Sequence, residues 1–152
     1  YLTQQYGVNT TFAGLAYTFF AIAMTTGRFT GHYLIRYFGE KKLLTYSAIC
    51  ATLGLALVSI APYWWLVLVG YTLVGTGCSN IVPIMFSRAG RQTVMPSAVA
   101  LSCVSTMAYT GILVGPAFIG MVSELIGLST VFMALSGLLL LIVALKRFTY
   151  VR

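Results

Sequence analysis

The chain has 152 residues, of which 59% are hydrophobic and only 7% are charged. Soluble domains carry about 25% charged residues, so this composition excludes an ordinary soluble domain and is far too apolar for a disordered chain. Nine basic residues against two acidic ones give a net charge of +7, but these basic residues are too few for a nucleic-acid-binding surface. The composition predicts a protein that crosses a membrane several times.

Uncharged runs locate the predicted membrane spans, because a transmembrane helix needs about 20 mostly apolar residues. The longest run, residues 43–87, is long enough for two helices, and Pro62 lies where they would separate. A β-barrel would need alternating polar and apolar positions, whereas residues 138–143 are apolar on every face. The sequence therefore predicts an all-α bundle of five transmembrane helices, at roughly residues 11–30, 43–61, 63–86, 97–121 and 127–146.

The basic residues predict the orientation of these spans, because Lys and Arg are enriched in cytoplasmic loops. All of them fall between the first and second spans, between the third and fourth, or after the fifth: Arg28, Arg36, Lys41, Lys42, Arg88, Arg91, Lys146, Arg147 and Arg152. We therefore expect the first residue outside and the C-terminus in the cytoplasm, in the plasma (inner) membrane of the cell. Arg28 and His32 are placed at the cytoplasmic end of the first span. An odd number of spans starting outside predicts a piece of a larger protein.

Groups that perform chemistry are missing from the predicted spans. No Asp, Glu, Lys or His stands at mid-span depth, so the sequence predicts neither a catalytic pair nor a metal cluster nor a proton relay. Cys50, Cys78 and Cys103 lie one to a helix in apolar surroundings, where we expect them to pack as small hydrophobic residues. The chain is not expected to be an enzyme, and no cofactor or metal is predicted.

Neutral polar side chains concentrate in the third and fourth spans. Thr76 and Asn80 are four residues apart in the third span, and Ser105 and Tyr109 are four residues apart in the fourth, so each pair shares a helical face. We expect these four side chains to contact a substrate. The fifth span carries only Ser136 between residues 131 and 145, which predicts a lipid-facing helix.

Asn80 and Tyr109 each fit two roles. The Asn80 amide could join two helices through a hydrogen bond, worth about 1 kcal/mol, or bind a neutral polar substrate. The Tyr109 ring could stack on a substrate while its hydroxyl bonds to it, or pack with the hydroxyl on a neighbouring backbone. The sequence leaves both pairs of roles open.

Proline and glycine predict where helices bend or approach one another. Pro83 and Pro116 each remove a backbone hydrogen bond, so each is predicted to kink its helix. The glycines of these two spans could serve either of two roles, close packing of helices or a moving hinge. They are Gly70, Gly75, Gly77, Gly111 and Gly115.

Three segments resemble the major facilitator superfamily. Residues 27–42 resemble its cytoplasmic loop signature, which follows the second helix of each six-helix half. Depending on which glycine is aligned, Arg36 or Ile35 stands where the family has an acidic residue, so the family's charge relay is not carried over intact. Residues 75–83 and 109–117 look like the tenth and eleventh helices of fucose-permease-like members.

The resemblance implies that residues 1–152 form the C-terminal six-helix half of a twelve-helix transporter, lacking most of the first helix of that half and all of the N-terminal half. It implies that Gly31, Arg36 and Gly39 belong to a cytoplasmic gate. It also implies that helices eight, ten and eleven line a central cavity, and that any proton-coupling carboxylates lie upstream.

The function that this resemblance implies is secondary active transport of a small polar or amphipathic solute by alternating access. Its partners would be the solute, the lipid bilayer and the missing N-terminal half, with no nucleic acid. The alternative is a membrane sensor or assembly subunit that keeps the same fold but carries no solute.

Overall fold

A computed structural model describes residue 7 and residues 9–149 of the chain, and these residues form helices joined by short connections, without a strand. The predicted all-α membrane bundle is therefore confirmed. The helices, in chain order, are α2 (Thr10–Phe38), α3 (Glu40–Ile60), α4 (Trp64–Ser79), α5 (Ile81–Arg91), α6 (Ser97–Ile126) and α7 (Leu128–Thr149).

Several of these helices have the length and composition of membrane spans. Among the described residues, three segments are long and apolar enough to cross a bilayer: Glu40–Ile60, Trp64–Arg91 and Ser97–Ile126. A shorter apolar helix covers Leu128–Ala144. Helix α2 has 29 residues, more than the about 20 that a span requires, but it carries basic side chains in its second half.

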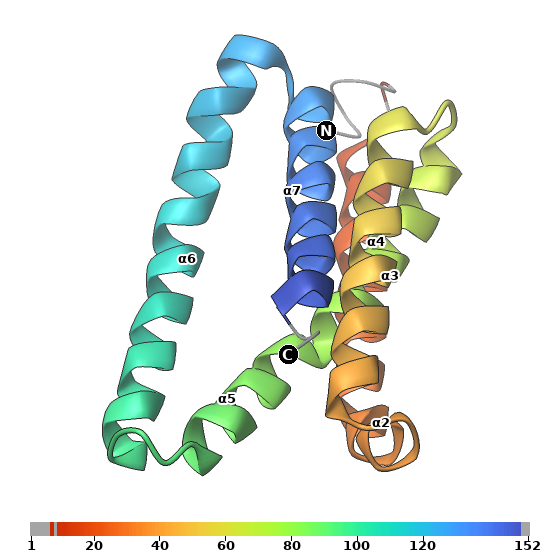
Figure 1. The fold of residues 1–152 in the computed structure, drawn as a ribbon. Coiled ribbons are helices and arrows are strands. Elements are labelled where there is room, and N and C mark those ends of the chain that lie inside the picture. The colour runs from red at the N-terminus through yellow and green to blue at the C-terminus, as the bar shows by residue number, and fades with distance from the viewer. Residues whose placement is uncertain (1–6, 8, 150–152) are drawn as a thin grey trace.

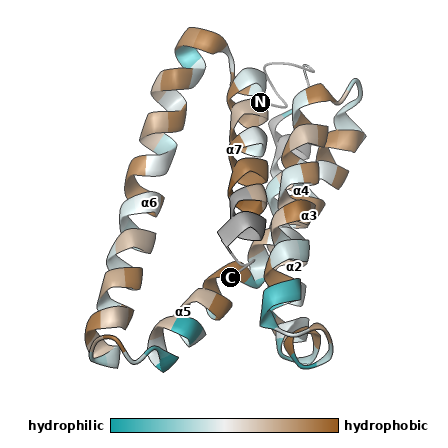
Figure 2. Ribbon diagram, viewed as in Figure 1, coloured by the Kyte–Doolittle hydropathy of each residue, from teal (hydrophilic) through white to brown (hydrophobic). Residues whose placement is uncertain are grey.

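The helices form a packed group and one outlying member (Figure 1). Helix α4 packs against both α2 and α3, and α7 packs along α3. Helix α6 is joined to this group through α5 at one end and α7 at the other, and it stands apart from α4. Hydrophilic positions gather where α5 ends and α3 begins, which we call the basic end of the bundle (Figure 2).

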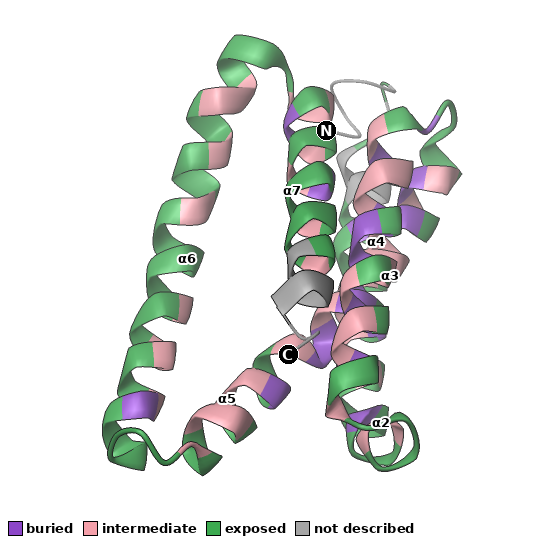
Figure 3. Cartoon of the chain, viewed as in Figure 1, coloured by how far each residue is buried: buried purple, intermediate pink, exposed green. Residues whose placement is uncertain are grey.

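Burial follows the same division. One third of the apolar window of α3, and of the segment formed by α4 and α5, is buried, against 6% for α6 (Figure 3). The buried side chains of the group are small or β-branched, such as Ala51, Val58 and Val67. Small side chains let helix axes approach closely, which is how membrane helices gain packing energy without a hydrophobic driving force between them.

Glycines of α4 make this close approach possible on two sides. A Cβ at Gly77 would lie 2.5 Å from the Ala51 nitrogen of α3. A Cβ at Gly75 would lie 2.5 Å from the Phe20 carbonyl oxygen of α2, and one at Gly70 would lie 3.0 Å from a carbonyl oxygen of α3. Close packing, one of the two roles left open, is therefore the role of Gly70, Gly75 and Gly77.

The boundary of the first predicted span was wrong. We expected a loop from residue 31, but α2 continues to Phe38 and ends at Gly39, whose N–H donates to the Ile35 carbonyl at 2.9 Å. Gly39 has φ 77°, a left-handed conformation that favours glycine, and it is the sole residue between α2 and α3. The charged residues at positions 28–36 indicate where the chain becomes more polar, and a helix can continue through such a segment.

The third predicted span, residues 63–86, is divided and extends further. The helix is interrupted at Asn80, between α4 and α5, and α5 continues to Arg91. Pro83 lies in the first turn of α5, where it cannot donate to the carbonyl of Ser79. Figure 1 shows α5 leaving the packed group at an angle and leading to α6.

Helix α6 runs without interruption through Pro116 to Ile126, five residues beyond the predicted end. Gly127, with φ 81°, is the sole residue between α6 and α7. Its N–H donates to the Ser123 carbonyl at 2.9 Å, so this corner repeats the arrangement at the end of α2.

Candidate functional site

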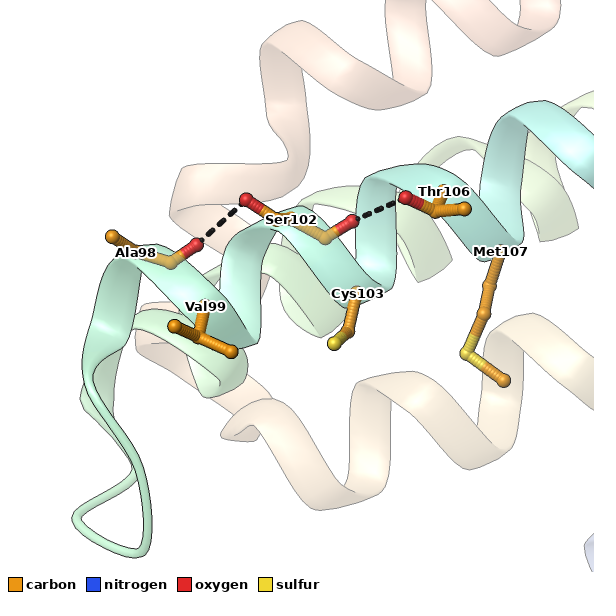
Figure 4. Close-up of a pocket in the computed structure, with 6 residues that line it drawn as sticks. All are labelled: Ala98, Val99, Ser102, Cys103, Thr106 and Met107. Atoms are coloured by element: carbon orange, nitrogen blue, oxygen red, sulfur yellow. Dashed lines mark hydrogen bonds between the residues drawn. The ribbon is translucent and has the colours of Figure 1, made fainter.

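Helix α6 has an exposed face on which a pocket lies. The pocket has a volume of about 560 Å³, and its lining comes from this one helix: Ala98, Val99, Ser102, Cys103, Thr106 and Met107. Val99, Cys103 and Met107 project from the same side of α6 (Figure 4). The lining is mostly apolar with a few hydroxyl groups, which is the usual chemistry of a small-molecule site.

The hydroxyl groups of α6 donate within their own helix. Ser102 donates to the Ala98 carbonyl and Thr106 to the Ser102 carbonyl, both at 2.9 Å (Figure 4). Ser105, which is half-buried, donates to Leu101 at 2.9 Å. Each hydroxyl oxygen keeps acceptor capacity, so this face offers acceptors to a ligand that brings its own donors.

Tyr109 lies one turn beyond Ser105 on the same helix. Its side chain is 68% exposed, and among the described residues its hydroxyl makes no hydrogen bond. The predicted alternative, a hydrogen bond from this hydroxyl to the backbone of a neighbouring helix, is therefore not formed within the described residues. A free phenol at this depth can both donate and accept, so the group is available to a solute or to another part of the protein.

Asn80 is buried at the joint between α4 and α5. It is 4% exposed, and its amide nitrogen donates to the Ser79 hydroxyl at 3.0 Å. Its side-chain oxygen lies against the backbone of Gly31 on α2, where the absence of a side chain provides the space. Of the two roles left open, this geometry favours the contact between helices.

Thr76 stands one turn before Asn80, and its side chain contacts α3. Its hydroxyl donates to the Leu73 carbonyl at 3.0 Å and lies 3.4 Å from the Cys50 sulfur of α3. The side chain is exposed. Thr76 and Asn80 therefore share α4 but have different neighbours.

The structure does not bring the four predicted substrate contacts together. Thr76 and Asn80 belong to the packed group, whereas Ser105 and Tyr109 belong to α6, which packs on α5 and α7 (Figure 1). The G-x-x-x-G pair of α6, Gly111 and Gly115, has no described atom within 4 Å of an added Cβ, so the described chain supplies no packing partner for it.

The predicted gate residues lie along the second half of α2 and at its end. Gly31 is buried against Asn80, Arg36 is exposed in the last turn, and Gly39 forms the corner with α3. The predicted orientation also involved Lys146, Arg147 and Arg152, but the last of these and the side chains of the other two lie outside the described residues.

An ion-pair cluster at the basic end was missed by sequence reasoning. Glu40 binds two arginines of α5: its carboxylate lies 3.5 Å from the Arg88 Nε, and it accepts a hydrogen bond from Arg91. The two arginines are three residues apart on one helical face, a spacing that could have indicated a shared acidic partner. The cluster joins the start of α3 to the end of α5.

We expect Glu40→Gln to lower the thermal stability of the full-length protein slightly, by less than about 1 kcal/mol, because partly exposed ion pairs contribute little. The charge reversal Glu40→Arg should cost more, since it faces two arginines with a third. The double variant Glu40→Arg with Arg91→Glu should recover part of that loss. Melting temperatures in detergent measure both effects, and a double variant no more stable than Glu40→Arg alone would contradict the pairing.

Comparison with known proteins identifies the family. The family model described as Major Facilitator Superfamily matches residues 1–151. The chain is 40% identical over 147 residues to an uncharacterised MFS-type transporter of Yersinia pestis, covering 97% of this chain and 38% of that protein. It is 34% identical over 128 residues to the membrane protein MosC of Rhizobium meliloti, covering 84% of this chain and 31% of MosC.

A third relative, an uncharacterised MFS-type transporter of Bacillus subtilis, is 30% identical over 139 residues, covering 89% of this chain and 31% of that protein. No solved structure matches the chain significantly. The chain thus spans about a third of the length of the curated relatives it matches. From the family model that covers nearly every residue, we conclude that the chain belongs to the Major Facilitator Superfamily.

Proposed function

We propose that the chain is the C-terminal half of a secondary active transporter that carries a small polar or amphipathic solute by alternating access. Membership of the superfamily supports membrane transport rather than catalysis. The share of its relatives that the chain covers, 38% in the Yersinia pestis protein, leaves room for an N-terminal half. The N-terminal half, the lipid bilayer and the solute would be its partners, and the basic end would face the cytoplasm of the cell's inner membrane.

The observation that carries this proposal is a row of hydroxyl groups on the exposed surface of α6. This helix has 30 residues with one buried side chain, Ala100, and a pocket lies on its surface. Hydroxyl groups recur along it at Ser102, Thr106 and Tyr109. A water-filled cavity between the two halves would account for both the exposure and the polarity.

The residues divide into contacts and supports. Ser105, Tyr109 and Thr76 are proposed to contact the solute when the missing half closes the cavity. Asn80 is proposed to support the site by holding α2 to the α4–α5 joint, and its direct contact with the solute stays a prediction. A fucose-permease-like subgroup and a gate that includes Gly31, Arg36 and Gly39, with bends at Pro83 and Pro116, stay predictions as well.

The sensor or assembly subunit remains the second candidate function, because it would keep the same fold. Its cavity, if present, would not open alternately to the two sides of the membrane. The two candidates therefore differ in the two-sided accessibility of the α6 pocket.

We expect Cys103 to react with membrane-impermeant thiol reagents from both sides of the membrane. Cys103 lines the pocket and is exposed, while Cys50 and Cys78 are partly buried. Alternating access would open the pocket to each side in turn, so the thiol should be modified from either side. The measurement uses the full-length protein in oriented vesicles, with its other cysteines replaced.

The variant Cys103→Ser in the same background serves as the control and should not be labelled. Labelling from one side alone would favour the sensor over the transporter. Labelling from neither side would place the pocket against lipid or protein and would remove α6 from the proposed site.

A further inference from the structure

Arg28 lies inside the membrane helix α2 and not at its end, contrary to the sequence prediction. It stands ten residues before the last residue of α2, a distance of about 15 Å at 1.5 Å per residue. The neighbouring helix agrees with this position. Gly27, adjacent to Arg28, lies against Ser79, which is the last residue of α4, before α5 leaves the packed group at an angle (Figure 1).

The basic end provides the reference for this depth. Arg88 lies 3.5 Å from Glu40, so the start of α3 and the end of α5 are at one level. Lys41 and Lys42 follow there. Measured along α2, Arg28 therefore lies about 15 Å from this level, about half of the about 30 Å thickness of a hydrocarbon core.

Arg28 belongs to a row of basic side chains along one face of α2. Arg28, His32 and Arg36 follow one another every four residues, and all three side chains are exposed. Residues four apart lie above one another on a helix. The face of α2 that packs on α4 is a different one, since it is made by Gly27 and Gly31.

The chain itself has no acidic group for Arg28. Only two acidic residues are present in the sequence. Glu40 is bound to Arg88 and Arg91, and Glu124 lies near the far end of α6. Among the residues that the structure describes, Arg28 makes no hydrogen bond or ion pair.

A charged side chain at this depth is not expected to face lipid. Placing arginine at the centre of a membrane helix costs about 2.5–3.5 kcal/mol on insertion scales, so such residues face protein or water-filled cavities. No described helix covers the exposed face of α2 around Arg28. That face is therefore turned toward a part of the protein outside this chain or toward water.

We propose that Arg28, continued toward the basic end by His32 and Arg36, makes the solute pathway attractive to anions, and that the solute carries a carboxylate, phosphate or sulfonate group. A guanidinium group binds such oxyanions in a planar, bidentate manner. In a cavity with walls of low dielectric constant, several charges of one sign raise the local concentration of the opposite ion. This inference rests on the proposed transport function and specifies its substrate class.

The test measures the charge preference of the pathway with a thiol placed near Arg28. Thr25 is exposed and lies three residues before Arg28 on the same face. In the full-length protein with its other cysteines replaced, reconstituted in phosphatidylcholine vesicles, the Thr25→Cys variant is treated with three methanethiosulfonates. One carries a neutral hydroxyethyl group, one an anionic sulfonatoethyl group and one a cationic trimethylammonioethyl group.

We expect the neutral reagent to react, and the anionic reagent to react faster than the cationic one by about fivefold, after correction for their rates with 2-mercaptoethanol in solution. Adding Arg28→Gln should abolish this preference, whereas Arg28→Lys should keep it. The matched control Lys42→Gln, which removes an equal charge at the basic end, should leave the preference unchanged. Addition of phosphatidylglycerol to the vesicles should also leave it unchanged.

Other outcomes overturn the inference in distinguishable ways. A reactive thiol without charge preference would leave the water-filled pathway intact but mean that an acidic group of the missing half neutralises Arg28. A preference lost on adding phosphatidylglycerol would assign Arg28 to lipid headgroups. A thiol that no reagent reaches would exclude this face from the pathway, while the two-sided reaction of Cys103 decides separately on transport.

Discussion

Gly77→Ala is expected to destabilise the full-length protein by roughly 1–3 kcal/mol, because the added methyl group overpacks the contact between α3 and α4. Its Cβ would lie 2.5 Å from the Ala51 nitrogen and 2.6 Å from the Ser47 carbonyl oxygen. Both atoms belong to the backbone of α3, so neither can rotate away as a side chain could. The helices would have to separate, and the melting temperature in detergent should fall by several degrees.

Gly137→Ala on α7 is the matched control. No described atom lies within 4 Å of a Cβ at this position, and alanine favours a helix over glycine by about 1 kcal/mol. Its melting temperature should therefore be unchanged or higher. Equal losses in the two variants would contradict the claim that the α3–α4 contact requires a glycine.

Gly31→Ala is expected to destabilise the protein by itself, because the buried Asn80 side chain must shift, but much less when Asn80 is also replaced by alanine. The added methyl group would overlap the side-chain oxygen of Asn80. In the variant Asn80→Ala that space is free, and the methyl group of Gly31→Ala would fill it. Stability and uptake in the two single variants and the double variant should show a coupling of about 1–3 kcal/mol.

Gly75→Ala, alone and combined with Asn80→Ala, is the control for this coupling. Its Cβ would meet the Phe20 carbonyl oxygen at 2.5 Å, a backbone atom that Asn80→Ala does not move. Its effect should therefore add to that of Asn80→Ala without coupling. Normal uptake with unchanged KM in Asn80→Ala would in addition remove that residue from the solute site, whereas additivity at Gly31 would contradict the contact described for it.

The fold could be predicted from sequence where composition alone determines it. In a bilayer the backbone satisfies its hydrogen bonds within a helix or within a closed barrel, and long uncharged runs without polar alternation favour the helix, so the all-α class followed directly. The end of α2 could not be predicted in this way. Arg28 and Arg36 have good helix propensity, and the glycine between them, Gly31, does not end the helix. The chain therefore continues to Gly39, whose positive φ ends it.

The candidate site was less accessible to sequence reasoning because it depends on which helical faces meet. A glycine motif does not reveal whether a neighbour is present: Gly77 packs tightly, whereas Gly111 does not within the described chain. The role of Asn80 depended on the glycine opposite it on another helix. The depth of Arg28 required the true length of α2 and the level of the Glu40 ion pairs.

The single-residue corner at Gly39 limits how the first two helices can move. Because a single residue connects the two helices, α2 cannot move along its axis or rotate appreciably unless the start of α3 moves as well. Glu40 joins the start of α3 to α5. A movement of the corner between α2 and α3 would therefore be transmitted to α5 and, through α5, to α6. The corner thus couples the movements of α2, α3 and α5 at the basic end.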